Sequence, residues 1–202
     1  MIEQAALANP LSLMLDKDRC DFTRSDMLKV IRERGIERLS FHYTSIDGKM
    51  RELKLPFADF TQAERILASG ERVDGSSLFP GLVDAAASDL YVVPSYRTAF
   101  LSPFDSSSLN FICRFLDRDG QPAAFTPDNI LAIAHGRIKE RTGLELHPLG
   151  ELEFFRVREG GPENFSAHRQ VGYHASSPFF KGGDVVNEMV RYLTQITGAV
   201  KY

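Results

Sequence analysis

Residues 39–56 read LSFHYTSIDGKMRELKLP, the most informative pattern of this sequence for its architecture. Apolar residues alternate with polar ones on both sides of its centre, namely Leu39, Phe41, Tyr43, Leu53 and Leu55. Asp47-Gly48 between the two halves is typical of a hairpin turn. Pro56 ends the second half because it has no N–H to donate to a neighbouring strand. The stretch therefore predicts a β-hairpin with one buried face.

The segments around the hairpin alternate between helical and strand patterns. A helix is expected to begin at Ser25 as its cap and to end at Gly35, and another to cover about residues 59–68. Residues 71–88 are rich in Gly, Ser and Ala, which favours an ordered loop. Strands are expected at residues 90–93, 98–101 and 109–116. This order predicts an α+β fold, a sheet with helices on one face.

The second half opens with strong signals for a helix start. Thr126 is expected as the cap and Pro127 as the first helical residue, with Gly143 ending the helix. Its spacing predicts a buried stripe of Ile130, Leu131, Ile133, Ala134 and Ile138. A long strand is expected at about residues 145–157, followed by a loop at 158–183.

The two ends of the chain carry weaker patterns. Residues 1–22 are expected to form a short helix or a loose leader. Near the other end, Asp184 is expected to cap a helix with one apolar face, formed by Val186, Met189, Val190, Leu193 and Ile196. Residues 199–202 have the pattern of half a strand. Because a strand needs hydrogen-bonded neighbours, we expect the sequence to be a piece of a longer protein.

Composition excludes several classes of function. The 202 residues carry 24 basic and 27 acidic side chains, a net charge of −3, without a polybasic stripe, which argues against nucleic-acid binding. No apolar run approaches the roughly 20 residues needed to span a bilayer. The two cysteines, Cys20 and Cys113, form no CxxC pair and are expected to be free thiols. We therefore expect a cytoplasmic protein.

Glu151 and Glu153 form the first candidate site. In a strand both side chains would project from one face, roughly 7 Å apart, with Leu152 and Phe154 on the other. Two carboxylates so placed repel unless a cation lies between them or water screens them, and hard oxygen ligands favour Mg²⁺ or Mn²⁺. A solvated outer face is the alternative. The presence of Phe155 on the side of the two glutamates weakens that alternative.

The second candidate site is the segment Val73-Asp74-Gly75-Ser76-Ser77. By composition it is a surface turn. Alternatively, Asp74 is a carboxylate placed to accept a proton or to bind a cationic substrate. The five histidines lack partners at ligand spacing, and the chain lacks a Walker loop and a dinucleotide fingerprint. The residues that would bind a nucleotide therefore stay unknown.

Taken together, the motifs resemble the glutamine synthetase family. They follow in order: Val73-Asp74-Gly75-Ser76-Ser77, Ser88-Asp89-Leu90, Val93-Pro94, Pro103-Phe104, Cys113-Arg114, Asp119-Gly120-Gln121-Pro122, Thr126-Pro127-Asp128 and Gly150-Glu151-Leu152-Glu153-Phe154-Phe155. After the leader at 1–22, the resemblance implies a β-grasp domain at 23–122 and, at 123–202, an incomplete beginning of the catalytic α/β domain.

The resemblance also implies an activity. Such enzymes use ATP to phosphorylate glutamate, and ammonia then displaces phosphate to give glutamine. By resemblance, Asp74 helps to bind and deprotonate ammonium, Ser77 is a nearby contact, and Glu151 and Glu153 bind Mg²⁺ or Mn²⁺. The full-length parent would be a homo-oligomeric ring in which the Asp74 loop reaches the neighbouring subunit's site. This piece alone is expected to be inactive.

Two alternatives stay open. The segment Leu78-Phe79-Pro80-Gly81 departs from the family pattern, since the chain has no Trp. The departure suggests a γ-glutamyl amine ligase that uses a larger amine. The absence of the catalytic half suggests a non-catalytic β-grasp module with a regulatory role.

Overall fold

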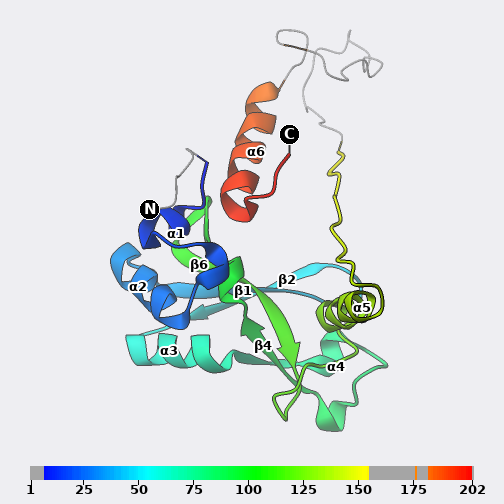
Figure 1. Cartoon of the computed structure of the whole chain (residues 1–202). Coiled ribbons are helices and arrows are strands. Elements are labelled where there is room, and N and C mark those ends of the chain that lie inside the picture. Colours follow the sequence, from blue (N-terminus) through cyan, green and yellow to red (C-terminus); the bar gives the residue numbers. More distant parts are fainter. Residues whose placement is uncertain (1–6, 155–175, 177–181, 202) are drawn as a thin grey trace, which may run out of the picture.

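The computed structural model describes residues 7–154, 176 and 182–201 (Figure 1). The helices are α1 (Pro10–Leu15), α2 (Arg24–Arg34), α3 (Phe60–Ser69), α4 (Gly75–Leu78), α5 (Pro127–Thr142) and α6 (Gly183–Thr197), with 3-10 turns η1 (Arg19–Asp21), η2 (Ala85–Ala87) and η3 (Tyr96–Thr98). The strands are β1 (Arg38–Thr44), β2 (Met50–Pro56), β3 (Glu71–Asp74), β4 (Asp89–Pro94), β5 (Phe100–Ser102) and β6 (Asp105–Leu116). None of the helices that the structure describes is long and apolar enough to cross a membrane.

All of these strands belong to one mixed sheet in the order β2-β1-β6-β4-β3, with β5 paired to β6. The neighbours β1 and β6 run parallel, with Phe41 beside Phe111. The other pairs are antiparallel. The sheet and its helices confirm the predicted α+β class.

The predicted hairpin is confirmed as β1 and β2, in which Leu39 lies opposite Leu55 and Phe41 opposite Leu53. The side chains of Leu39 and Phe41 are fully buried. The ring of Phe41 meets that of Phe111 edge-on at 5.9 Å, which is a favourable geometry for aromatic pairs. The hairpin therefore forms one wall of the core.

Helices α2 and α3 pack on the same face as these inward side chains. Their buried residues belong to one apolar cluster with those of β1, β4 and β6. Helix α3 is capped by Asp59, as the predicted range implies. Helix α2 begins earlier than expected, because Thr23 is its cap. Thr23 and Asp26 form a capping box that satisfies free N–H groups at both positions.

Residues of the expected leader also contact this body. Helix α1 contributes Leu11 to the core cluster, and Phe22 after η1 joins it too. Asn9 caps α1 by accepting from the Leu11 amide at 2.8 Å.

The segment at 71–88 is not wholly a loop. It contains β3, which pairs with β4, and the short helix α4. Strand β3 is an edge strand with a single apolar residue, Val73, so its pattern was too short to indicate a strand. The strand expected at 98–101 begins later, at Phe100, since η3 covers Tyr96–Thr98.

Helix α5 forms as predicted from Pro127, but its predicted buried stripe is wrong. The apolar side chains of that stripe are exposed: Ile130, Leu131, Ile133, Ala134 and Ile138. The buried residue of α5 is instead Asn129. Periodicity shows that a helix has an apolar face, whereas the hydrogen bonds of Asn129 decide which face meets the sheet.

Two predicted strands are also absent. Residues 145–154 have no regular secondary structure, and 155–157 lie outside the described residues. No strand in the described part of the chain runs beside this segment, and a strand is not stable without a neighbour. Residues 199–201 likewise form no strand. Most of the loop expected at 158–183 lies outside the described residues.

Helix α6 forms as predicted, although Gly182 rather than Asp184 is its cap. Its apolar face is only partly covered, and Leu193 is exposed. Contacts between α6 and the body include three residues of its C-terminal half. Arg19 donates to the carbonyl oxygens of Ile196 and Thr197, and the ring of Tyr192 lies edge-on to that of Phe104.

Candidate functional site

The turn from β3 into α4 holds the first predicted site. Strand β3 ends at Asp74, opposite Asp89 of β4, and α4 begins at the next residue. The Gly75 amide donates to the Ser88 carbonyl at 2.7 Å, which ties the turn to the start of β4. A Cβ on Gly75 would lie 2.7 Å from that same oxygen, so only glycine fits here without a shift of the backbone.

The carboxylate of Asp74 accepts hydrogen bonds on both of its oxygens. Oδ1 accepts from the Ser76 amide at 3.0 Å and from the Ser76 hydroxyl at 2.7 Å. Oδ2 accepts from the Ser77 hydroxyl at 2.6 Å. The structure therefore brings Asp74 and Ser77 together, and the side chains of both are exposed to solvent.

These donors determine the charge of Asp74. The Ser77 hydroxyl, followed by the Ser76 hydroxyl, lowers the pKa of Asp74 to about 2, because hydroxyl groups that point at a carboxylate favour its ionised form. The Ser76 amide and the Ser88 hydroxyl act in the same direction, and partial desolvation opposes them. At neutral pH the turn therefore presents a negative charge in a defined orientation.

Glu151 and Glu153 lie in the segment that follows α5, where the chain has no regular structure. Both side chains are exposed, and so are those of Leu152 and Phe154 between and beside them. The alternation of faces expected of a strand therefore has no basis in this segment. Phe155, which was expected on the same side as the two glutamates, lies outside the described residues.

A divalent cation would suit the oxygen donors of the two glutamates by chemical type. However, the described residues contain no group of three or more His, Cys, Asp or Glu side chains that is placed to hold a metal ion. Two exposed carboxylates are fewer than the six ligands that Mg²⁺ prefers, and water would have to supply the rest. The described part of the chain does not assemble a metal centre.

Gly75 and Ser76 lie in the predicted segment, but the sequence assigned a site role only to Asp74 and Ser77. The signal was present: an Asp followed two residues later by a Ser is the pattern in which a side-chain oxygen caps a turn. The close approach of Gly75 to β4 has no local signal, because the partner, Ser88, lies on another segment.

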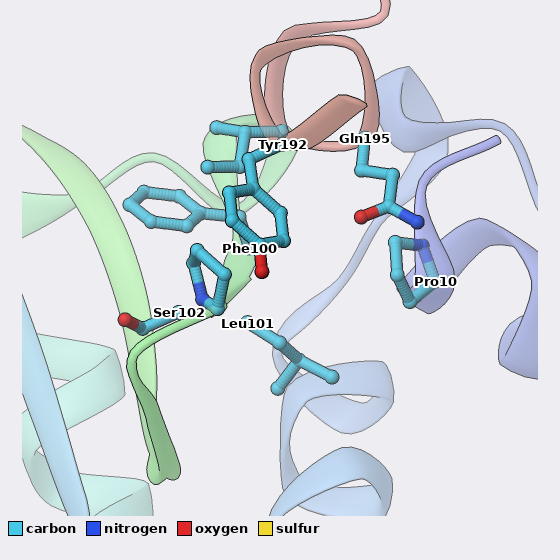
Figure 2. A pocket seen from close by; sticks show the side chains of 8 residues that line it. Pro10, Phe100, Leu101, Ser102, Tyr192 and Gln195 are labelled. Carbon is cyan, nitrogen blue, oxygen red and sulfur yellow. The ribbon is translucent and has the colours of Figure 1, made fainter. Parts of the chain in front are cut away.

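Two clefts lie elsewhere on the molecule. One, of about 170 Å³, lies between α1, β5 and α6 (Figure 2). Tyr192 and Gln195 of α6 line it together with Pro10 and Leu101. A shallower cleft lies between α2 and α3, where the Arg32 guanidinium stacks 4.9 Å from the centre of the Phe60 ring. Neither is lined by the predicted site residues.

A mixed sheet with a parallel central pair and helices packed on one face defines the class as an α+β domain. Residues 35–118 match the family model described as glutamine synthetase, β-grasp domain. This match covers β1 to β6 with α3 and the Asp74 turn between them.

Curated relatives extend the match beyond this domain. A glutamine synthetase of Thermus thermophilus is 27% identical over 181 residues, 85% of this chain and 40% of its own length. A glutamine synthetase of Clostridium saccharobutylicum is 24% identical, again over 40% of its length. A 3-hydroxylaminophenol mutase of Cupriavidus pinatubonensis is 30% identical over 141 residues, 69% of this chain and 27% of the mutase. The chain thus spans less than half the length of these relatives.

Solved structures share the fold. The cryo-EM structure of Plasmodium falciparum glutamine synthetase superposes with a TM-score of 0.51 at 20% identity, covering 59% of this chain and 23% of that one. GmaS in complex with ADP superposes with a TM-score of 0.50 at 18% identity, covering 56% and 25%. The family-model match over residues 35–118 and the similarity to curated glutamine synthetases support membership in the glutamine synthetase family.

Proposed function

We propose that this chain is the N-terminal part of an ATP-dependent ligase that joins ammonia to the side-chain carboxylate of glutamate through a γ-glutamyl phosphate. Family membership supports the reaction class. The observation that carries the proposal is the Asp74 carboxylate, exposed, ionised and held by three hydrogen bonds. Because the chain covers 40% of the glutamine synthetases it matches, it is proposed to be inactive without the rest of the protein.

Asp74 is proposed to attract the ammonium cation and to orient it. A carboxylate with a pKa of about 2 is a weak base at neutral pH, whereas a general base works best with a pKa near the working pH. We therefore assign Asp74 the role of a fixed negative charge, and the proton of ammonium would pass to another group. Ser77 is proposed to contact the same substrate through its exposed hydroxyl.

Glu151 and Glu153 are proposed as two ligands of Mg²⁺ or Mn²⁺. When bound, the metal would neutralise charge on the phosphates of ATP. Its further ligands would come from parts of the protein other than the described residues. The proposal rests on the hard oxygen donors and on the family, and it is independent of the role of Asp74.

We also propose that the full-length protein is a cytoplasmic homo-oligomer. In a ring of identical subunits, the exposed Asp74 turn of one subunit would lie against its neighbour and complete the neighbour's site. The exposed side chains of Asp74, just before α4, and of Ser77, within α4, support this arrangement. The small net charge of −3 agrees with glutamate, ammonia and ATP as partners, and not with nucleic acid.

The test uses the full-length natural protein that carries this sequence. ADP and amide products are measured with glutamate, ATP and ammonium. Wild-type protein is expected to form both in equal amounts, and Asp74→Asn to lower kcat/KM for ammonium by about 10- to 100-fold, as expected for a hydrogen bond to a charged group. Asp18→Asn is the matched control, because Asp18 also caps a short helical turn and is also exposed. No ADP formation by wild-type protein with any amine would refute the ligase.

A larger amine is the second candidate acceptor. The fold neighbour GmaS is a γ-glutamylmethylamide synthetase, and residues 78–81 differ from the family pattern. The structure explains part of that difference, since Phe79 is fully buried and packs edge-on against Phe115 and Phe125. Ammonium, methylamine, ethanolamine and a polyamine are compared at equal concentration. A higher kcat/KM for ammonium rejects the larger acceptor.

A further inference from the structure

Ser76 donates two hydrogen bonds to the carboxylate of Asp74. Its amide and its hydroxyl both donate to Oδ1, at 3.0 Å and 2.7 Å. The side chain of Ser76 is half-buried, whereas that of Ser77 is exposed. The two serines of the turn are therefore not equivalent.

We propose that Ser76 is a positioning residue, whose hydroxyl holds the Asp74 carboxylate in one orientation so that the outward side of the carboxylate faces a small ammonium-type cation. This inference rests on the proposed function, in which Asp74 binds the amine substrate. Ser76 itself does not contact the substrate, because its hydroxyl is directed at Oδ1 and its side chain is partly covered.

The turn around Ser76 is rigid enough for this role. Gly75 is buried, and its amide donates to the Ser88 carbonyl at 2.7 Å. On the other side, the Phe79 amide donates to the Gly75 carbonyl at 2.8 Å, and Phe79 is fully buried in the core. Ser76 thus stands between two anchored residues, so its amide and Cβ have a defined place from which to hold Asp74.

The different roles of Ser76 and Ser77 follow from the geometry at the two carboxylate oxygens of Asp74. Oδ1 receives two bonds from one residue, whereas Oδ2 receives one bond from the exposed Ser77. Ser77 is able to exchange its bond to Asp74 for a bond to substrate, because its side chain faces solvent. Ser76 keeps the carboxylate in place while that exchange occurs. The low pKa of Asp74, to which both hydroxyls contribute, agrees with this arrangement.

Two measurements test the role of Ser76 with the same variants. The first follows the Asp74 carboxyl carbon by NMR through a pH titration of this chain. We expect a pKa of about 2 in wild type, a higher pKa in Ser76→Ala, and a return toward the wild-type value in Ser76→Thr, which keeps the hydroxyl. Ser95→Ala is the matched control. Ser95 is also half-buried and also precedes a helical turn, but its side chain makes no capping bond.

The second measurement uses the full-length protein and separates KM from kcat. Ser76→Ala is expected to raise KM for ammonium by about 10-fold, the effect of roughly 1.4 kcal/mol, with a smaller change in kcat. Ser76→Thr is expected to restore most of the affinity, and Ser95→Ala to match wild type. Equal KM values in Ser76→Ala and Ser95→Ala, or a pKa of Asp74 that Ser76→Ala leaves unchanged, would overturn the inference.

The two proposals fail in different ways. If the wild-type protein consumes no ATP with any amine, the proposed function fails, and the NMR titration still decides whether Ser76 holds Asp74. If wild-type protein is active and Ser76→Thr is as impaired as Ser76→Ala, the hydroxyl is not what matters, and the positioning role fails alone.

Discussion

The replacement of Asn129 by Ala is expected to loosen the junction between α5 and the sheet. Asn129 is 1% exposed. Its Nδ2 donates to the carbonyl oxygens of Phe115 and Ala123 at 2.8 and 3.0 Å and to the Thr126 hydroxyl at 3.0 Å. Its Oδ1 accepts from the Arg114 guanidinium at 2.9 Å. One buried amide thus joins β6, the segment after it and α5.

The magnitude follows from these contacts. Each hydrogen bond contributes about 1 kcal/mol net, and a buried polar group left without a partner costs about 1–3 kcal/mol. The cost is moderated because the Phe115 carbonyl keeps its bond from the Ala123 amide. Alanine also favours a helix over asparagine by up to about 0.7 kcal/mol. Asn129→Ala should therefore lower the free energy of unfolding by about 2 kcal/mol.

Urea unfolding of this chain, followed by circular dichroism, measures the effect. With a slope of about 1–3 kcal/mol per molar urea, the midpoint should fall by about 1 M. Asn129→Asp keeps the size and the acceptor for Arg114 but removes the donors, so it should be at least as destabilising. Asn187→Ala in the exposed face of α6 is the control, and its midpoint should stay near that of wild type. Equal midpoints for Asn129→Ala and Asn187→Ala would refute the reasoning.

Three further outcomes are expected of this chain. Gly75→Ala should lower the unfolding free energy by about 1–3 kcal/mol in a urea titration, since its Cβ would lie 2.7 Å from the Ser88 carbonyl oxygen, and an unchanged midpoint would contradict that clash. The low pKa of Asp74 should stabilise the fold above about pH 3.8, with the contribution lost as pH falls toward about 2. In Asp74→Asn the urea midpoint should therefore change less with pH over that range than it does in wild type. An equally steep dependence of the midpoint on pH in the variant would exclude Asp74 as the cause. A thiol reagent should modify the exposed Cys20 rapidly in native protein. It should modify Cys113, which is buried and whose pKa is raised by burial, only in urea. Rapid reaction of both cysteines in native protein would show that Cys113 is accessible.

The sequence was most informative where a pattern is local. The hairpin of β1 and β2 follows from alternation around Asp47-Gly48, and the pairing of Leu39 with Leu55 confirms it. The proximity of Asp74 and Ser77 is similarly local, because a turn places the two side chains three residues apart on one side. In both cases the residues that decide the geometry are neighbours in the sequence.

Prediction failed where the outcome depends on a distant partner. The apolar stripe of α5, including Ile130 and Leu131, is exposed, whereas the side chain of α5 that is bonded to β6 is the buried amide of Asn129. Strand β3 was not predicted because its four residues are held in a strand by their pairing with β4. The strand predicted around Glu151 does not form, since no described strand is placed to pair with this segment.

Asp74 is proposed to offer a fixed negative charge to the cationic substrate of a ligase. The KM for ammonium of the full-length protein, measured for wild type, Asp74→Asn and Asp18→Asn, tests this claim most directly. We predict a rise of about 10-fold or more for Asp74→Asn alone, with ATP-dependent amide formation retained by the control. The same KM in all three proteins would contradict the claim.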